Sequence, residues 1–429
     1  MNICIIGAGY VGLTTSATLA EFGHRVYCVD INSDKIQKLQ NGNIPIYEPQ
    51  LKELICKNNE KITFSTNLPD SIQRCTAIFV TVGTPSLIDR SPDLSFLNSV
   101  FTTIAQHLQS YKTIFIKSTV PPGTNQKMHH FLLEKGVSPS MYNIVSNPEF
   151  LREGSAIHDM FHPDRTVIGI AEGDKQSEAI AREIYQPLSA PLIVTSWNGA
   201  EMIKYASNAF LATKISFINE ISRICDLYEV DVTNVAKGMG ADPRIGPLFL
   251  QAGIGYGGSC FPKDLQALQH IAAAKFVSTP ILDAVHEVNS SQLDCYIKKL
   301  QEDLPSIRDK KVTVLGIAFK PNTDDTRHSP AIALIQKLHS LGADVHTYDP
   351  KAFLPADLRH LATQHKSLKS SYIDSEAIII ATDWPEICQL DWKQVKAHLK
   401  GNLILDGRNC INREEVLGFG LNYKGVGRG

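Results

Sequence analysis

Cys260 lies in a short segment whose residue types suit nucleophilic chemistry. Four glycines precede it, at positions 253, 255, 257 and 258, so a bulky ligand could lie directly against a backbone that carries no side chains. Pro262 suits the first turn of a helix, and the N–H groups of a helix beginning there would favour the thiolate form of Cys260. Asp264 would share the cysteine's face of that helix. A buried, unreactive cysteine is the alternative, but the glycines and the following Pro-Lys-Asp favour a reactive thiol.

A glycine-rich turn near the N terminus predicts a dinucleotide site. Gly7-Ala-Gly-Tyr-Val-Gly12 follows an apolar, β-branched run and precedes an amphipathic segment that extends to about Phe22. This strand-turn-helix context makes the glycine pattern informative, although a tight turn without a ligand is the alternative. The next predicted strand, residues 25–30, ends in Asp30. Its carboxylate can accept a hydrogen bond from a ribose 2′-OH and would repel a 2′-phosphate, so we expect NAD rather than NADP.

Two further predicted strands end in loops that should line the nicotinamide side of this site. Residues 77–82 lead into Gly83-Thr-Pro85, and residues 113–117 lead into Ser118-Thr-Val-Pro-Pro-Gly-Thr124. Ligands of such sheets bind outside the carboxyl ends of the strands, which is where both loops begin.

An acidic pair follows another predicted strand, residues 143–146. Glu149 and Glu153 are one helical turn apart and could share a face. Exposed acids are usually solvated surface, but the position of this pair at a strand end favours a functional role.

A long helix is predicted from Asn198 to about Tyr228. Asn198 is expected as its N-cap, with Glu201 at the acidic position of a capping box. Lys204 and Asn208 are one turn apart, and a helix lysine ordinarily faces solvent. Apolar positions on more than one side of the segment suit a domain connector or a dimer interface.

The C-terminal part repeats the N-terminal order of strand, helix and strand. Predicted strands lie at residues 310–319, 342–349, 377–381 and 402–406. The first turn differs, because Phe319-Lys-Pro-Asn-Thr-Asp-Asp-Thr-Arg327 replaces the glycine fingerprint. Its lysine and arginine, with Arg408 at a neighbouring strand end, suit phosphate oxygens. We therefore expect a second, different phosphorylated ligand, and a thiolate close to a nicotinamide could capture an aldehyde and pass through a thioester.

The predicted fold class is α/β, with two Rossmann-like three-layer domains joined by a long central helix and a small helical domain. We place the NAD-binding domain at residues 1–196, a central helical or dimerisation domain at 197–300, and a domain for the phosphorylated ligand at 301–429.

Composition narrows the functional classes. The chain has 42 basic and 44 acidic residues among 429, which does not favour nucleic acid or an anionic membrane as a partner. Nine scattered cysteines without a C-x-x-C pair suit a reducing compartment, and the cytoplasm is expected. No apolar run is long enough to predict a membrane span, and no metal site is predicted.

Five motifs in order resemble those of the UDP-glucose/GDP-mannose dehydrogenase family. They are Gly7 to Gly12, Ser118 to Thr124, Asn147-Pro-Glu-Phe-Leu-Arg-Glu-Gly154, Gly255-Tyr-Gly-Gly-Ser-Cys-Phe-Pro-Lys-Asp264 and Phe319 to Arg327. The resemblance covers essentially the whole chain. It implies oxidation of the C6 alcohol of UDP-glucose to the carboxylate of UDP-glucuronate, with NAD as cofactor and no metal. A homodimer or higher homo-oligomer through the central helix is also expected.

The resemblance also implies catalytic roles. Cys260 would be the nucleophile that holds a thiohemiacetal and then a thioester, and Lys204 would be a buried cation that stabilises oxyanions, contrary to the solvent-facing expectation above. Asp264, supported by Thr119, would assist proton transfer through water. Glu149 would activate the hydrolytic water, although its division of labour with Asp264 stays open. Asn208 would orient the sugar.

Binding residues follow from the same resemblance. Those implied for NAD are Gly7, Gly9, Tyr10, Val11, Gly12, Asp30, Lys35, Thr84, Thr119, Glu153 and Arg327. Those implied for the nucleotide sugar are Glu149, Phe150, Leu151, Glu153, Lys204, Asn208, Arg244, Phe249, Gln251, Gly253, Tyr256, Gly257, Cys260, Lys320 and Arg408. Arg244 would reach a sugar in the neighbouring subunit.

Three alternatives remain open from the sequence. The same chemistry could act on GDP-mannose or a UDP-N-acetylhexosamine, because the residues that recognise the base and the sugar C2 lie in loops that the sequence does not place. A non-catalytic nucleotide-sugar sensor would bind without releasing NADH. A two-electron alcohol dehydrogenase would need no thiol.

Overall fold

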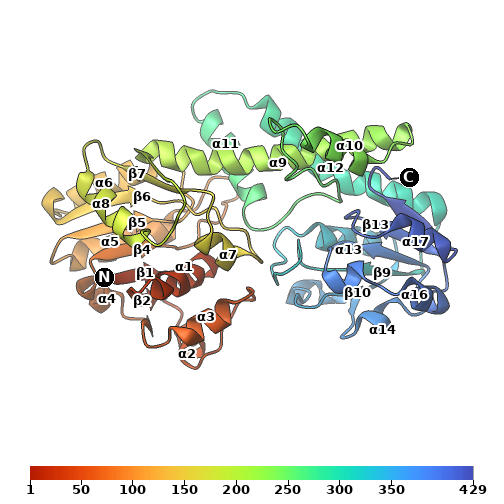
Figure 1. Ribbon diagram of the computed structural model, residues 1–429, viewed down its shortest axis with the longest axis horizontal. Helices are drawn as coiled ribbons and strands as arrows, with labels where there is room; N and C mark the ends of the chain where they lie inside the picture. The colour runs from red at the N-terminus through yellow and green to blue at the C-terminus, as the bar shows by residue number, and fades with distance from the viewer. Residues whose placement is uncertain (429) are drawn as a thin grey trace. The chain divides into compact units, whose positions relative to one another are not determined.

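The computed structural model describes residues 1–428 and divides the chain into two compact units (Figure 1). Unit 1 comprises Met1–Ser207 and Gln266–Ile271, and unit 2 comprises Asn208–Leu265 and Ala272–Gly429. The three-domain division remains a prediction. Among residues 1–428, no helix combines the length and apolar character needed to cross a bilayer.

Unit 1 contains an eight-stranded sheet in the order β3-β2-β1-β4-β5-β6-β7-β8. All neighbouring strands are parallel except β6 and β7. The strands are β1 (Asn2–Ile6), β2 (Arg25–Val29), β3 (Ile62–Ser65), β4 (Ala77–Val80), β5 (Lys112–Ile116), β6 (Tyr142–Ser146), β7 (Thr166–Ile170) and β8 (Leu192–Ser196). The strand order reverses between β1 and β4, which is where open α/β sheets bind ligands.

Helices cover both faces of this sheet because its central strands are apolar on both sides (Figure 1). On β1, Ile3 and Ile5 pack in one core, and Cys4 and Ile6 pack in the other. The helices are α1 (Tyr10–Glu21), α2 (Ser33–Gln40), α3 (Leu51–Lys57), α4 (Leu68–Arg74), α5 (Ser95–His107), α6 (Thr124–Glu134), α7 (Ala156–Phe161) and α8 (Lys175–Ile184), with a 3₁₀ turn at Pro139–Met141.

Unit 2 contains an all-parallel six-stranded sheet in the order β11-β10-β9-β12-β13-β14. The strands are β9 (Lys311–Leu315), β10 (Asp344–Tyr348), β11 (Thr363–Gln364), β12 (Ala377–Ile380), β13 (Leu403–Asp406) and β14 (Asn422–Gly425). The second α/β domain predicted from the repeated pattern is therefore confirmed.

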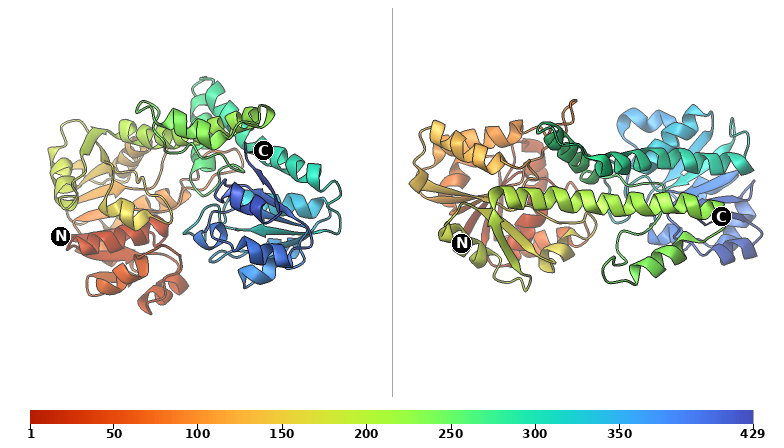
Figure 2. Two further views of the ribbon diagram at one scale, coloured as in Figure 1. Left: turned by 45° about the vertical axis from the view of Figure 1, so that its right-hand side comes forward. Right: turned by 90° about the horizontal axis from the view of Figure 1, so that it is seen from above.

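Helical segments make up most of the remainder of unit 2. They are α10 (Val232–Gly240), α12 (Pro280–Asp303), α13 (Pro330–Ser340), α14 (Leu368–Tyr372), α15 (Pro385–Cys388), α16 (Trp392–His398) and α17 (Arg413–Gly418), with a 3₁₀ segment at Ala356–Leu361. Two more helices, α9 (Trp197–Leu227) and α11 (Phe261–Ala273), contribute residues to both units. Within unit 2, α12 runs beside α9, where Arg223 hydrogen-bonds Gln292 and Ser291 (Figure 2).

The capping box predicted for the long helix is wrong. Helix α9 begins at Trp197, directly after β8, and the N–H of Gly199 donates to the Ser196 hydroxyl rather than to Asn198. Glu201 instead accepts from the N–H groups of Gly123 and Asn125, at the N terminus of α6. Its carboxylate therefore caps a different helix, distant in sequence, which is a tertiary contact that spacing along the chain does not reveal.

Candidate active site

The glycine fingerprint forms a tight turn between β1 and α1. Gly7 has a φ of +106°, which L side chains rarely adopt, and a Cβ on Gly12 would collide with the Gly7 carbonyl oxygen. At Gly9 a Cβ would meet no atom within 4 Å. The turn therefore leaves open space beside the N terminus of α1, where the dipole favours a pyrophosphate. This arrangement fits a dinucleotide.

Asp30 is held at the end of β2 beside this turn. One carboxylate oxygen accepts from the N–H of Ala8 at 2.9 Å and from Lys35 Nζ at 2.8 Å. Burial raises the pKa of Asp30, but the contacts with Lys35, Asn32 and Ala8 outweigh it and lower the pKa below its usual value. The acid is therefore ionised at neutral pH, as a ribose-binding carboxylate should be.

The equivalent acid of unit 2, Asp349, already accepts hydrogen bonds from the protein at both carboxylate oxygens. Asp349 ends β10 as Asp30 ends β2, but one of its oxygens accepts from Ile317, Ala318 and the indole of Trp384. The other oxygen accepts from the N–H groups of Lys351 and Ala352. No acceptor position is left for a ribose, so the second sheet does not repeat the dinucleotide site.

Loops after two adjacent strands are joined in unit 1. The Thr84 hydroxyl, after β4, donates to the carbonyl of Thr119, after β5, at 2.8 Å. These two predicted cofactor residues are therefore brought together at the carboxyl edge of the sheet, on the β4 side of the point where the strand order reverses.

A buried ion pair lies at the end of β6. Lys204 Nζ on α9 donates to Glu149 Oε1 at 3.0 Å, and their side chains are 4% and 8% exposed. The N–H of Leu151 donates to the other Glu149 oxygen at 2.5 Å. Burial raises the pKa of Glu149, but the charge of Lys204, this hydrogen bond and the charge of Lys117 together lower it. Glu149 is therefore an ionised acceptor inside the protein.

The structure corrects the shared helical face expected for Glu149 and Glu153. It also corrects the solvent-facing position that a helix lysine ordinarily takes, and it confirms the buried position that the resemblance implies for Lys204. Residues 147–153 form no helix, so Glu149 and Glu153 do not share a helical face, and α7 begins only at Ala156. Lys204 is buried and does not face solvent. Phe150 lies beside it, with its ring centroid 5.3 Å from Lys204 Nζ and 4.0 Å from the Arg165 guanidinium. The loop after β6 and helix α9 therefore bring an acid, an aromatic ring and a cation together.

Glu48 is a residue that the sequence analysis missed. It is 5% exposed, and it accepts from the Tyr10 hydroxyl and from the N–H groups of Gly154 and Ala156. Its carboxylate therefore fastens the loop that carries Glu149 to the first residue of α1. The sequence offered only one signal, an acid between prolines in an otherwise apolar segment, Ile46-Tyr-Glu-Pro49.

Cys260 directly precedes α11 in unit 2, as predicted. The N–H of Asp264 donates to the Cys260 carbonyl at 2.8 Å, which places the cysteine at the N-terminal boundary of the helix. The thiol is half-buried, and its sulfur lies 3.5 Å from the Ser259 hydroxyl. A thiol in this position lies at the positive end of the helix dipole.

Asp264 and Asn208 are brought together in the same unit. Asn208 Nδ2 donates to Asp264 Oδ2 at 2.6 Å, and Lys263 Nζ donates to Oδ1 at 2.5 Å. Asp264 is 1% exposed, so both carboxylate oxygens are engaged inside the protein. The pair fixes the orientation of each side chain.

The glycines before Cys260 make room for the protein's own chain. A Cβ on Gly257 would collide with the His328 carbonyl, and one on Gly258 would lie 2.7 Å from the Phe319 ring. The expectation that these glycines expose backbone to a ligand is therefore wrong at these two positions. Their small size lets the cysteine loop pack against the 319–328 segment.

Arg408 spans the same loops from the end of β13. Its guanidinium donates to the carbonyls of Ala381, Gly255 and Phe319, at 2.7, 3.2 and 3.0 Å. Burial lowers the pKa of Arg408, although neighbouring Asp383 opposes this effect. The cation is thus held by neutral carbonyls, which leave its charge available to an anion.

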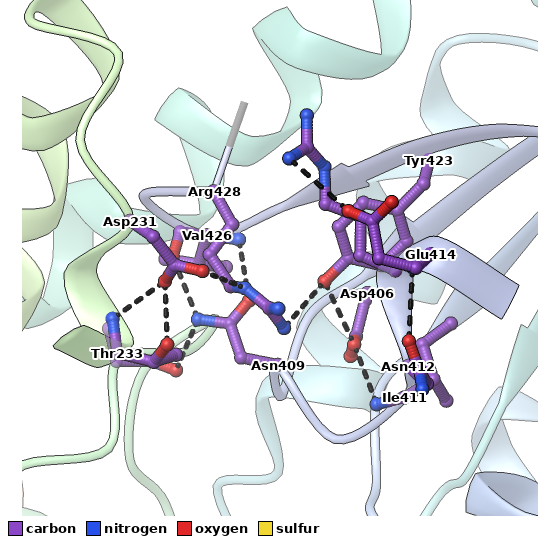
Figure 3. A network of polar contacts seen from close by, with 12 residues as sticks. Asp231, Thr233, Asp406, Asn409, Ile411, Asn412, Glu414, Tyr423, Val426 and Arg428 are labelled. Atoms are coloured by element: carbon purple, nitrogen blue, oxygen red, sulfur yellow. Dashed lines mark hydrogen bonds and ion pairs between the residues drawn. The ribbon is translucent and has the colours of Figure 1, made fainter. Parts of the chain in front are cut away.

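The residues after Arg408 are fixed by a polar network (Figure 3). Asp406 accepts from the Tyr423 hydroxyl at 3.2 Å and from the N–H of Ile411 at 3.0 Å. Arg428 joins the Tyr423 hydroxyl to Asp231, which caps α10. The β13 turn is therefore rigidly connected to the C-terminal segment.

The other predicted ligand residues of unit 2 differ in exposure. Arg244 and Arg327 are exposed and form bidentate pairs with Asp242 and Asp325. Phe249 adopts a φ of +65°, and its ring centroid lies 6.2 Å from that of Phe261 at an interplanar angle of 57°. Further members are the exposed Gln251, the half-buried Lys320 and the buried Gly253 and Tyr256.

The predicted site residues are divided between the two units. Unit 1 holds the glycine fingerprint, Asp30, Lys35, Thr84, Thr119, the 149–153 segment and Lys204. Unit 2 holds Asn208, Arg244, Phe249 to Cys260, Asp264, Lys320, Arg327 and Arg408. Each unit assembles its own group.

Three family models match the chain in order. They describe the NAD binding domain (residues 1–189), the central domain (198–291) and the UDP binding domain (313–413) of the UDP-glucose/GDP-mannose dehydrogenase family. A UDP-glucose 6-dehydrogenase of Bacillus subtilis is 44% identical over 431 residues, covering 100% of this chain and 93% of the relative.

Solved structures show the same similarity. A UDP-glucose dehydrogenase from Pyrobaculum islandicum matches with a TM-score of 0.91 and 34% identity, over 100% of this chain and 98% of its own. A UDP-D-ManNAc dehydrogenase from Pyrococcus horikoshii matches with a TM-score of 0.89 and 27% identity, over 100% of both chains.

Proposed function

Because the chain belongs to the UDP-glucose/GDP-mannose dehydrogenase family, and is therefore an NAD-dependent oxidoreductase, we propose that it oxidises UDP-glucose to UDP-glucuronate. The observation that carries the choice of substrate is full-length similarity to UDP-glucose 6-dehydrogenases. We assign residues 1–196 to NAD binding, 197–300 to the central domain and 301–429 to UDP-sugar binding.

The turn at Gly7 to Gly12 would hold the pyrophosphate of NAD at the N terminus of α1, and Asp30 would hold the adenosine ribose. Lys35, Thr84, Thr119, Glu153 and Arg327 complete the proposed set. When bound, NAD⁺ accepts one hydride from the sugar C6 in each of two oxidations.

Cys260 supplies the nucleophile between the two oxidations. In the first oxidation the C6 hydroxyl would lose its proton to a base and the C6 carbon would lose a hydride to bound NAD⁺, which would leave an aldehyde. The Cys260 thiolate would bond to the aldehyde carbon and form the oxyanion of a thiohemiacetal, which would become a thioester on loss of its hydride to bound NAD⁺. Water then cleaves the C–S bond and releases the carboxylate and the thiol. The start of α11 supports this role because it favours the thiolate.

Lys204 stabilises negative charge on the C6 oxygen. Because Lys204 is buried, its electrostatic attraction to that oxygen is stronger than it would be in water. Glu149 is ionised and accepts a proton from the hydrolytic water, while Asp264 and Thr119 assist proton transfer. Asn208 orients the sugar and is itself fixed by Asp264.

In unit 2, Arg408 and Lys320 would bind the UDP phosphates, since a guanidinium fork suits phosphate oxygens. The further nucleotide-sugar residues that we propose in unit 2 are Phe249, Gln251, Gly253, Tyr256 and Gly257, and those that we propose in unit 1 include Phe150 and Leu151. The assignment of Lys320 and Arg408 follows the match of residues 313–413 to a UDP binding domain.

A homo-oligomer is supported by an apolar stripe on α9. Phe210, Phe217 and Ile224 recur every seven residues, and they are 65%, 44% and 48% exposed. Such a stripe suits a second copy of the same helix. The exposed Arg244 would reach the neighbouring subunit's sugar. The nine free cysteines suit the reducing cytoplasm.

Purified protein tests this proposal when it is supplied with NAD⁺ and one nucleotide sugar at a time. We expect NADH to form with UDP-glucose at a kcat/KM at least about tenfold above that with GDP-mannose, UDP-N-acetylglucosamine or UDP-N-acetylmannosamine. A higher value with one of the other sugars would assign that substrate instead. Binding of UDP-glucose without NADH formation would indicate a sensor.

A further inference from the structure

Lys117 is a buried lysine at the carboxyl end of β5 to which no motif assigns a role. It is 4% exposed. Its Nζ donates to Asn147 Oδ1 at 3.4 Å and lies 6.0 Å from the centroid of the Tyr185 ring. The same Asn147 oxygen accepts from the Tyr185 hydroxyl at 2.5 Å. The ammonium therefore has one long hydrogen bond to an oxygen that is already engaged.

This environment makes a purely structural role unfavourable. An ammonium loses its hydration on burial, and a single long hydrogen bond to a neutral amide does not replace it. Burial accordingly lowers the pKa of Lys117 to about 8. An apolar side chain of similar length would fill the same space without this cost, so the charge itself calls for an explanation.

The explanation lies in the ion pair at the end of the next strand. The charge of Glu149 raises the pKa of Lys117, and the charge of Lys204 lowers it. Lys117 in turn lowers the pKa of Glu149. Ile116 of β5 pairs with Ser146 of β6, so Lys117 and the loop that carries Glu149 follow neighbouring strands at one edge of the sheet, and Lys117 bonds Asn147 in that loop. The buried charges here are two cations, Lys117 and Lys204, and one anion, Glu149.

We propose that Lys117 is a positioning residue that sets the charge balance of the Glu149–Lys204 pair. Its ammonium keeps Glu149 ionised and leaves a net positive charge among these three groups when an oxyanion develops on the substrate. The inference rests on the proposed function, because the pair acts on the sugar only if the chain is such a dehydrogenase.

Arg165 and Tyr185 also lie near these charged groups. The Arg165 guanidinium and Lys204 Nζ both lie near the Phe150 ring, and this ring joins Arg165 to the pair. Tyr185 is neutral, since burial raises its pKa.

Removal of Lys117 would leave Lys204 as the single buried cation beside Glu149. Glu149 would then take up a proton at higher pH, and its ionised form would be lost earlier on acidification.

The test is the pH dependence of kcat for UDP-glucuronate formation in Lys117→Met, because kcat includes the hydrolytic step in which Glu149 accepts a proton. Glu149 is active when ionised, so activity falls as the pH drops through its pKa, and a raised pKa moves this acidic limb upward. We expect an upward shift of about one pH unit. Lys112→Met is the matched control, because Lys112 is 2% exposed on the same strand but donates to Ser110 and Gln73. Its acidic limb should stay in place.

An unmoved limb in Lys117→Met, with activity otherwise reduced, would assign Lys117 a structural role and overturn the inference. A second measurement does not depend on catalysis, and its titration is made on the wild-type protein. In wild-type protein with ¹³C-labelled lysine, the Cε signal of Lys117 should titrate near pH 8. Loss of this signal in Lys117→Arg assigns it.

Titration of that signal near the ordinary lysine value, about 10.4, would contradict the inference. Failure of the wild-type protein to reduce NAD⁺ with any nucleotide sugar would overturn the proposed function instead. The two failures are therefore distinguishable.

Discussion

Lys204 and Glu149 form an ion pair of 3.0 Å that solvent scarcely reaches. The two residues are 55 positions apart, and the pair forms because α9 passes the carboxyl end of β6. Charges buried in this way are seldom retained for stability alone, because desolvation offsets much of their attraction. The pair is therefore the strongest geometric sign of function in unit 1.

Removal of the cation should leave an uncompensated buried carboxylate. We expect Lys204→Met to lower the free energy of unfolding by about 3 kcal/mol at pH 7. The folded pKa of Glu149 is lowered in the wild type, so the stability it contributes is present above its unfolded pKa, about 4.3, and is lost as the pH falls through the folded value. The difference between variant and wild type should therefore narrow at acidic pH.

Urea unfolding at pH 7 and pH 4 measures this difference. Lys127→Met, on the exposed face of α6, is the control and should change stability by less than about 0.5 kcal/mol. An equal loss at both pH values would show that Glu149 is not the titrating partner.

Replacement of the nucleophile should separate binding from chemistry. Cys260→Ser should lower UDP-glucuronate formation by about 10³-fold or more, because a hydroxyl at the start of α11 is a far weaker nucleophile than a thiolate. Calorimetry should still show binding of NAD⁺ and UDP-glucose. Cys295→Ser, at a half-buried cysteine on α12, should leave product formation unchanged. Undiminished acid production by Cys260→Ser would contradict the thioester route.

Replacement of Glu48 by alanine should remove an acceptor that several hydrogen-bond donors share. In Glu48→Ala, the N–H of Ala156 and the Tyr10 hydroxyl lose their acceptor, and the N–H of Gly154 keeps only the Tyr10 oxygen. We expect the free energy of unfolding to fall by about 2 kcal/mol and the KM values for NAD⁺ and UDP-glucose to rise together. Glu60→Ala, at an exposed position, is the control. A rise in only one KM would show that Glu48 does not link the two loops.

Arg408→Lys should affect the nucleotide sugar selectively. A lysine cannot reach the three carbonyls that the guanidinium engages, nor can it present a fork to phosphate. We expect the KM for UDP-glucose to rise about tenfold or more while the Kd for NAD⁺ stays constant. Steady-state kinetics and calorimetry decide this, with the exposed Arg359→Lys as control. An unchanged KM for UDP-glucose would remove Arg408 from the proposed phosphate site.

A charge on the α9 stripe should disrupt self-association. Phe217→Glu places a carboxylate in the middle of the exposed series Phe210, Phe217 and Ile224. We expect sedimentation to show a smaller species than the wild type at the same concentration. Phe353→Glu, at another exposed phenylalanine of unit 2, should leave the sedimentation coefficient unchanged. Identical species for Phe217→Glu and the wild type would place any interface elsewhere.

Much of the fold was predictable from short-range patterns. The buried parallel strands are continuous apolar runs, so residues such as Ile3 to Ile6 and Ala377 to Ile380 could be recognised directly. Pro262 predicted the helix that follows Cys260. These signals are local, and tertiary packing did not override them.

Contacts between distant segments were not predictable in the same way. Glu201 occupied the spacing of a capping box, yet it caps α6 because β8 leads straight into α9. The glycines at 257 and 258 indicated a close approach without identifying the approaching group, which is the chain at His328 and Phe319. Lys117 and Glu48 carry no local signature, because their significance depends on partners brought near by the sheet.

The stoichiometry of the reaction tests the central claim most directly. NADH formed and UDP-glucose consumed should be measured together in one reaction run to completion. The proposed sequence of two oxidations predicts about two NADH for each UDP-glucose. A ratio of about one, with an aldehyde as the product, would contradict it.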